Sequence, residues 1–152
     1  MRFAPILAAV LLGGAAPWLP NPATTPGAID GGASLAQICR HGWSTRSIRP
    51  PVAYTEALKR HQLLDHADRR PWRYEEDHLV SLDLGGAPRD PRNLWPEPRA
   101  GACGAAVKDR LEWVLHQRVC AGGVSLGVAQ REIAADWVGA YRRWVGPLRC
   151  GG

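Results

Sequence analysis

The stretch from Tyr74 to Pro98 constrains the fold more than any other part of the chain. It contains an adjacent acid and histidine, Asp77 and His78, at the head of a segment in which side chains alternate in character. One face of that segment carries His78, Val80 and Leu82, and the other carries Leu79, Ser81 and Asp83. Alternation with a period of two predicts a strand. An acid and an imidazole are therefore expected to be fixed at the start of a strand.

A turn and a loop are predicted after this strand. Gly85 and Gly86 supply a tight reversal that glycine makes at low cost. A loop rich in proline and aspartate then returns Asn93 next to the apolar Leu94 and Trp95. An acid, an imidazole and an amide brought together in this way suit a metal-assisted attack of water on a phosphodiester.

Three elements of this stretch resemble the front half of the HNH nuclease motif, the ββα-metal finger: Glu76-Asp77-His78-Leu79, Gly85-Gly86 and Asn93-Leu94. Further short motifs make the chain similar to small secreted bacterial proteins described as HNH-nuclease-like. They are Ile38-Cys39, Arg49-Pro50-Pro51, Tyr54-Thr55, Leu58-Lys59, Lys108 to Glu112, Val119-Cys120 and Asp136-Trp137. The resemblance implies an α+β fold, a mostly helical small domain built around an HNH-like finger at residues 74–112 and stabilised by disulfides.

The resemblance also implies a role in phosphodiester hydrolysis for three residues of the finger. His78 is the expected general base, because the pKa of an ordinary imidazole lies near neutral pH. Asp77 is the expected metal ligand, because a carboxylate is a hard oxygen donor. Asn93 is expected to orient His78 and to pin the loop through hydrogen bonds. The competing interpretation, a turn-capping acid beside a hydrogen-bonded histidine, is disfavoured by the Gly-Gly pair and Asn93 in register.

The chain departs from the family pattern on the helix that should complete the metal site. The resemblance implies a histidine just before Val107, and this chain has Ala106 there, which offers no donor atom. Asp109 or Glu76 could replace that ligand, water could fill the position, or the site could be weakened. Asp109 could instead form an ion pair on the helix surface. One divalent cation, Mg²⁺, Mn²⁺ or Zn²⁺, is the expected cofactor.

Basic residues near the finger are candidates for contacts with phosphate groups. They are Arg73, Arg89, Arg92, Arg99 and Lys108. The formal net charge is +5, which favours a polyanionic partner, although a bias toward arginine can equally reflect genome composition. Such contacts give salt-dependent binding without sequence reading. Nucleic acid, DNA rather than RNA, is the expected partner.

The N-terminus predicts an export signal. Residues 1–16 combine Arg2, an apolar run and a small-residue end, which is typical of a secretory signal peptide and too short to span a bilayer. Cleavage after Ala16, Ala23 or Ala28 is possible, and an uncleaved anchor is the alternative. Residues 17–34, rich in glycine and proline, predict a flexible leader. The domain proper is expected at residues 35–150, with no transmembrane segment after the signal.

The four cysteines are Cys39, Cys103, Cys120 and Cys150. An even number after an export signal predicts disulfides, and the absence of Cys-x-x-Cys spacing disfavours a zinc ribbon. Four cysteines allow three pairings, and the resemblance favours Cys39 with Cys120, which leaves Cys103 with Cys150. The protein is expected to be periplasmic or extracellular, bacterial and monomeric. The histidines outside the finger show no spacing typical of a metal site.

Helices are predicted on both sides of the finger. A single turn is expected at Ser34–Cys39 and a helix capped by Thr55 is expected to reach about His66. Apolar residues at helical spacing predict a helix from Ala105 to Val119 and another capped by Ser125. The aromatic residues of the last helix, Trp137, Tyr141 and Trp144, are expected to belong to the core rather than to stack on bases.

Two functions from different classes follow from these features. The first is a metal-dependent HNH-type endonuclease of low sequence specificity, with His78 as base and Asp77 as ligand. The second is a catalytically inactive HNH-like domain that binds a polyanion or a partner in the cell envelope. Ala106 favours the second function, and the Asp77, His78 and Asn93 set favours the first.

Overall fold

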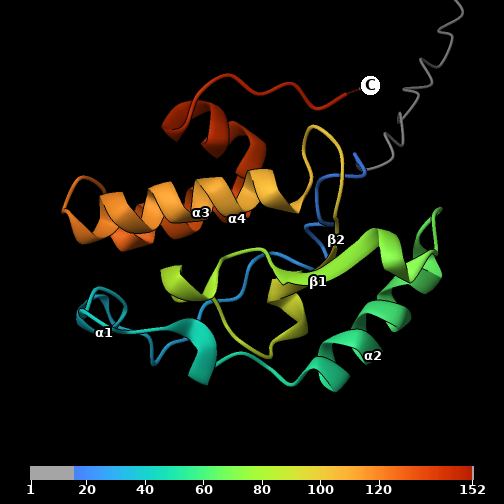
Figure 1. Cartoon of the computed structure of the whole chain (residues 1–152), viewed down its shortest axis with the longest axis horizontal. Coiled ribbons are helices and arrows are strands. Elements are labelled where there is room, and N and C mark those ends of the chain that lie inside the picture. Colours follow the sequence, from blue (N-terminus) through green and yellow to red (C-terminus); the bar gives the residue numbers. More distant parts are fainter. Residues whose placement is uncertain (1–15, 152) are drawn as a thin grey trace, which may run out of the picture.

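The chain forms a pair of strands flanked by helices (Figure 1). The structure is a computed structural model that describes residues 16–151, so the signal peptide predicted at residues 1–16 lies almost wholly outside the described residues. The helices and strands are α1 (Leu35–Ile38), α2 (Val52–Gln62), β1 (Tyr74–His78), β2 (Leu94–Pro98), α3 (Ala105–Cys120) and α4 (Leu126–Trp144). Short 3-10 turns lie at Thr45–Ser47, Leu63–Asp65, Pro71–Arg73, Leu82–Leu84 and Pro91–Asn93. The predicted small α+β domain is confirmed at this level.

Strands β1 and β2 pair antiparallel, and the strand predicted to continue past His78 ends there. Tyr74 lies opposite Pro98, and His78 lies opposite Leu94. The alternation predicted for the next residues is wrong, because Leu79 and Val80 are both buried. The cause is local: the side chain of Asn93 bonds both the N–H and the carbonyl of Val80, which removes these groups from any strand ladder.

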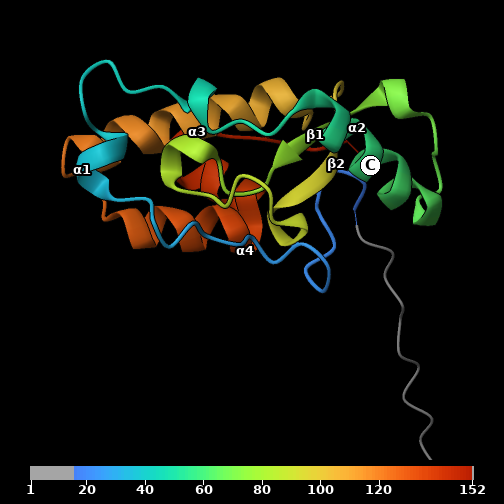
Figure 2. The same cartoon turned by 90° about the horizontal axis from the view of Figure 1, so that it is seen from below.

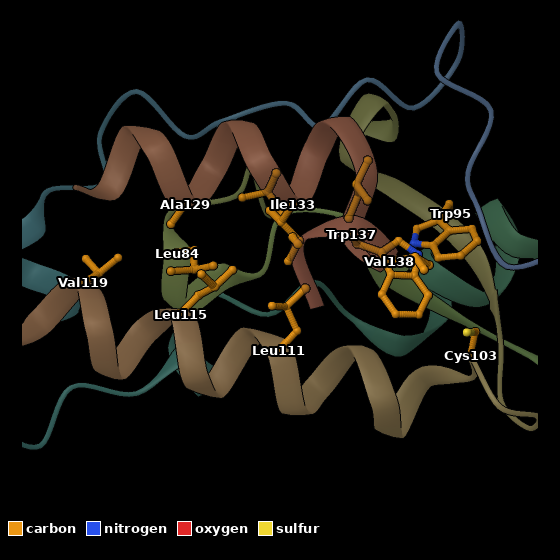
Figure 3. Packing of buried hydrophobic residues seen from close by; sticks show 13 residues of the cluster. Leu84, Trp95, Cys103, Leu111, Leu115, Val119, Ala129, Ile133, Trp137 and Val138 are labelled. Carbon is orange, nitrogen blue, oxygen red and sulfur yellow. The ribbon is translucent and has the colours of Figure 1, made fainter. Parts of the chain in front are cut away.

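The main core lies between α3 and α4, as the helical spacing predicted (Figure 3). Leu111 and Leu115 of α3 face Ala129 and Ile133 of α4, and Leu84 from the loop fills the space between the two helices. Trp137 is 1% exposed and donates its indole N–H to the Trp18 carbonyl at 2.8 Å. Trp137 is therefore a core residue, as expected.

Helix α2 begins earlier than the sequence predicted. It starts at Val52, directly after Pro51, whereas Thr55 lies within the first turn and bonds the Val52 carbonyl at 3.0 Å. A proline suits the start of a helix because its φ is already fixed near the helical value and the first turn needs no N–H there. Helix α2 packs on the side of the strand pair away from α3 and α4 (Figure 1).

Ser125 caps α4, as predicted, and Ser34 caps the predicted short turn, α1. Within α4, Asp136 has an extended backbone and the helix is kinked there. The Asp136 carboxylate accepts the Gly139 N–H at 3.0 Å. The segment after the kink therefore starts from its own side-chain cap.

Two disulfides join distant parts of the chain, Cys39 to Cys120 and Cys103 to Cys150. These are the pairs that the resemblance favours. Cys103 precedes α3 and Cys120 is its last residue, so the two bonds anchor α3 at both ends. Two disulfides are typical of proteins in an oxidising, exported environment. Within residues 16–151, no helix has the length and apolar character that a membrane crossing requires.

Part of the segment predicted to be a flexible leader, residues 17–34, bonds the rest of the fold. We call residues 25–30 the N-terminal strap. Its backbone bonds Gly27 and Ala28 to the Arg92 carbonyl and Asp30 to the Gly85 carbonyl at 2.9–3.3 Å. Figure 2 shows the segment running along α4. The glycine- and proline-rich composition predicted flexibility. The bonds seen here are made by backbone N–H groups, which glycine supplies as well as a residue with a large side chain does.

Candidate functional site

His78 lies at the last position of β1 and is 8% exposed. Its Nε2 is 3.0 Å from the Pro88 carbonyl oxygen. A carbonyl only accepts, so Nε2 carries the proton and Nδ1 keeps its lone pair. Among the described residues no hydrogen bond involves Nδ1. The imidazole therefore keeps one nitrogen that can accept a proton.

The surroundings of His78 keep the imidazole neutral. Burial lowers the pKa of His78 most strongly, and the positive charges of Lys108 and Arg49 lower it further. The hydrogen bond to Pro88 and the charge of Asp77 act in the opposite direction, without reversing the shift. A neutral ring at neutral pH is the form that can accept a proton from water.

Asn93 is fully buried and pins the loop between the strands. Its Oδ1 accepts the Val80 N–H at 2.9 Å, and its Nδ2 donates to the carbonyls of Val80 and Ala87 at 3.0 and 3.1 Å. Gly86 fits beneath this amide, because a Cβ at that position would lie 1.8 Å from the Val80 oxygen. The amide is thus fully used by the loop backbone and acts on His78 only by fixing that loop.

Asp77 points toward α3, where it meets Lys108. The Lys108 Nζ lies 2.8 Å from Asp77 Oδ2, 2.7 Å from the His78 carbonyl oxygen and 3.6 Å from Glu97 Oε2, and it also bonds Glu112. Lys108 is fully buried. The prediction that Lys108 contacts phosphate is therefore wrong, because its ammonium group is enclosed by carboxylates and has no exposed surface.

More acids than bases gather around this ammonium. Burial tends to raise the pKa of Asp77, but the charge of Lys108, its hydrogen bond to Asp77 and the neighbouring Glu97 carboxyl group outweigh it and bring the pKa to about 2. Burial raises the pKa of Glu112 to about 8 and raises that of Glu97 well above its usual range. One ammonium group shared by three carboxyl groups leaves net negative charge, which protons or a further cation would neutralise.

A set of oxygen donors converges on the same place. One oxygen each of Asp77, Asp109 and Glu112 lies within 4.8 Å of the others. Asp109 is exposed, so the set opens to solvent on one side. Glu112 was missed by the sequence analysis, although its spacing of three residues from Asp109 places both on one face of α3. Ala106 lies exposed in the first turn of that helix and contributes no donor.

Glu76 is not part of this donor set. Its neighbours are on α2, where the positive charge of Lys59 and the negative charge of Glu56 act on its carboxyl group. Both of its carboxyl oxygens are buried without a hydrogen-bond partner among the described residues. Its carboxyl group therefore faces α2, whereas Asp109 and Glu112 of the donor set lie on α3. The suggestion that Glu76 replaces the missing helix ligand is therefore wrong.

The exposed arginines near the site differ in how they are paired. Arg73 bonds Asp68 at 2.8 Å, Arg92 bonds Asp90 at 2.6 Å and Arg99 bonds Glu75 at 2.7 Å. Arg89 is exposed without an ion pair among the described residues. Arg49, which the sequence analysis did not consider as a site residue, acts through its charge on both His78 and Asp109. It adds a guanidinium group to the open side of the site.

No protein-family model, curated protein or solved structure matches this chain. The chemical interpretation of the site therefore depends on the geometry given above. That geometry consists of a neutral imidazole whose Nδ1 makes no hydrogen bond among the described residues, the carboxyl groups of Asp77, Glu97 and Glu112 around one buried ammonium group, and Asp109 on the exposed side.

Proposed function

We propose that this domain is an exported HNH-type endonuclease that hydrolyses phosphodiester bonds of nucleic acid, with little sequence specificity and with a divalent cation. Two observations carry the proposal: the Nδ1 of His78 makes no hydrogen bond among the described residues, and the adjacent Asp77 joins Asp109 and Glu112 in a set of converging oxygen donors. Hydrolysis of a phosphodiester needs both an activated water and a held cation.

The donors suit a hard divalent cation, and Asp77, Asp109 and Glu112 would hold it. Carboxylate oxygens are preferred by Mg²⁺ and Mn²⁺. When bound, the cation would stabilise the negative charge on the phosphate. Asp77 and Glu112 already bond Lys108, so this ammonium group fixes both carboxylates in place and also competes for them.

His78 acts in this proposal as the general base. The Pro88 carbonyl holds the ring in one tautomer, and Asn93 holds the loop that carries that carbonyl. Water that approaches Nδ1 would lose its proton there as it attacks phosphorus. Arg49 and Arg89, which no acid neutralises among the described residues, would hold the phosphate.

One observation favours a second function, binding of a polyanion or an envelope partner without catalysis. The Lys108 ammonium group sits directly on Asp77 and Glu112, where a catalytic cation would need to bind. The Lys108 ammonium group could neutralise these carboxylates without any metal ion. In that case the fold would present its arginines to a ligand and perform no hydrolysis.

Cleavage of supercoiled plasmid tests the proposal. The oxidised protein is incubated with Mg²⁺, Mn²⁺, Zn²⁺ or a chelator, alongside the variants His78→Ala and Asp77→Asn. We expect metal-dependent nicking that falls at least about 10²-fold in both variants, the usual contribution of a general base. His61→Ala is the matched control, because His61 is exposed on α2 and takes no part in the site.

Suppose that the folded protein fails to cut the plasmid with any of these metals but still binds it in a gel-shift assay. This result would contradict the nuclease proposal and support the binding function. Cutting that survives in both variants would show that a different site, or a contaminant, performs the reaction. Circular dichroism of every variant establishes that the fold is intact before activities are compared.

A further inference from the structure

A second group of metal-ligating side chains surrounds the Cys39–Cys120 disulfide, at the opposite end of α3 from Lys108. The Nε2 of His116 lies 3.5 Å from Cys120 Sγ and 3.2 Å from the Ile38 carbonyl oxygen. One ligand atom from each of Cys39, His116 and Cys120 lies within 4.8 Å of the other two. Cys120 is exposed and the other two residues are partly buried, so solvent reaches the group.

The positions of these residues suit coordination as well as a covalent bond. His116 and Cys120 are four residues apart on α3, so they lie one above the other on a single helix face. Cys39 ends α1 and supplies the third atom from across the interface. Two thiolates and one imidazole are the ligands that zinc prefers, and a water molecule completes the tetrahedron in sites with three protein ligands.

We propose that reduction of the Cys39–Cys120 bond converts this group into a zinc site, held by Cys39, His116 and Cys120. A dithiol supplies the two electrons: it becomes a disulfide itself, and its two protons pass to the sulfurs of the broken bond. Zn²⁺ then displaces both thiol protons into solvent. For Nε2 to bind the metal, its proton leaves the Ile38 carbonyl and Nδ1 carries the proton instead.

The zinc site would keep the same two parts of the chain together that the disulfide joins. The end of α1 and the end of α3 are linked by a covalent bond when the protein is oxidised, and by zinc when it is reduced. The second disulfide has no such alternative, because no metal-binding group among the described residues includes Cys103 or Cys150. The inference is independent of nuclease activity, since it concerns other residues and a different metal environment.

Thiol protection tests the proposal with an internal control. The full protein is reduced with a phosphine, mixed with Zn²⁺, alkylated briefly with iodoacetamide and analysed by peptide mass spectrometry. We expect zinc to slow alkylation of Cys39 and Cys120 at least about tenfold, while Cys103 and Cys150 react at the same rate with and without zinc. Equal protection of all four thiols, or none, would overturn the proposal.

Metal binding itself is measured with Co²⁺ as a spectroscopic probe and Zn²⁺ in competition. The reduced protein is expected to show cobalt–thiolate charge-transfer bands and to bind one more zinc ion per chain than the oxidised protein, whose spectrum should lack these bands. His116→Ala is expected to weaken zinc binding at least about tenfold, a loss seen even for outer-sphere partners of metal ligands. His61→Ala, which removes an exposed histidine elsewhere, should leave it unchanged.

His116→Cys separates loss of a ligand from loss of fold. A cysteine at this position restores a ligand atom, so cobalt bands and thiol protection should return in this variant even if His116→Ala folds poorly. Zinc affinity that is the same in His116→Ala as in the parent protein would show that the histidine is not a ligand. That result would contradict the proposed set of zinc ligands.

Discussion

Glu76 lies in an environment that disfavours its negative charge. It lies on the α2 face of β1, where burial raises its pKa to about 8 and the charge of Lys59 only partly opposes the shift. The folded state therefore keeps a proton on Glu76 up to about pH 8, whereas the unfolded chain releases it near pH 4.5. Between these pH values the folded state binds more protons, so its stability falls as pH rises.

Glu76→Gln is expected to remove this pH dependence. Glutamine has the shape of the protonated acid, so the variant should match the parent near pH 4 and exceed its unfolding free energy by on the order of 2 kcal/mol at pH 8.5. Urea unfolding at a series of pH values measures the difference. Asp65→Asn, at an exposed position after α2, is the control. Parallel curves for Glu76→Gln and the parent would contradict the explanation.

The burial of Lys108 is a property of a single residue that could not be predicted from the sequence. The pattern around it predicted a helix, and the helix is present, but a lysine on a helix has the same letter whether it faces water or a core. Its burial follows from Asp77 on one strand and Glu97 on the other, which only folding brings to it. His78, Asp77 and Asn93 could be selected from sequence because they are close along the chain.

At the scale of elements, the loop between β1 and β2 depends on one close approach. Gly86 lies against the Val80 carbonyl and the Asn93 amide, with no room for a Cβ. This is the physical reason for a glycine at the predicted reversal, and Gly85 beside it has a positive φ of 76°. The loop carries the Pro88 carbonyl that fixes the tautomer of His78, so its shape and the site are linked.

Gly86→Ala is expected to destabilise the fold by on the order of 3 kcal/mol, because the added methyl group forces the Val80 backbone and Asn93 apart. Gly31→Ala is a matched control, since a Cβ there meets no atom within 4 Å. Denaturant unfolding of both variants gives the comparison. A Gly86→Ala protein as stable as Gly31→Ala would show that the loop can move aside without cost.

The helices and strands were predicted correctly where a long apolar pattern and a capping residue lie within the element itself. The two last helices were found from apolar spacing and from the Ser125 cap. The start of α2 was missed because both Thr55 and Pro51 are residues typical of a helix N-terminus. The helix begins directly after Pro51. The end of β1 was missed because hydrogen bonds from Asn93, at the other end of the loop, stop the strand.

At the scale of the whole molecule, the N-terminal strap connects the loop between β1 and β2 with α4, two parts that are far apart in the sequence. It bonds the loop at Gly85 and Arg92 and packs on α4, where a Cβ on Gly27 would lie 2.8 Å from Ala134. Composition alone predicted a leader, because glycine and proline are common in linkers. The outcome depends on bonds to a loop that lies more than fifty residues further along the chain.

The strap gives different stabilities to the possible mature proteins. A protein lacking residues 1–16 retains the strap, whereas a protein lacking residues 1–28 loses its bonds from Gly27 and Ala28. At about 1 kcal/mol for each hydrogen bond, we expect the shorter protein to have a Tm lower by on the order of 10 °C. Differential scanning calorimetry of both proteins measures this shift. Equal Tm values would mean that the strap contributes nothing to stability.

The two disulfides have a consequence for a protein exposed to proteases. The loop closed by Cys39 and Cys120 overlaps the loop closed by Cys103 and Cys150, so every peptide bond from residue 39 to residue 150 lies inside at least one ring. A protease that cuts once in that range opens a ring but does not separate the pieces. The nicked molecule gains one water and loses no residue, and the strands, α3 and the site remain held together until a second cut or a reductant releases them.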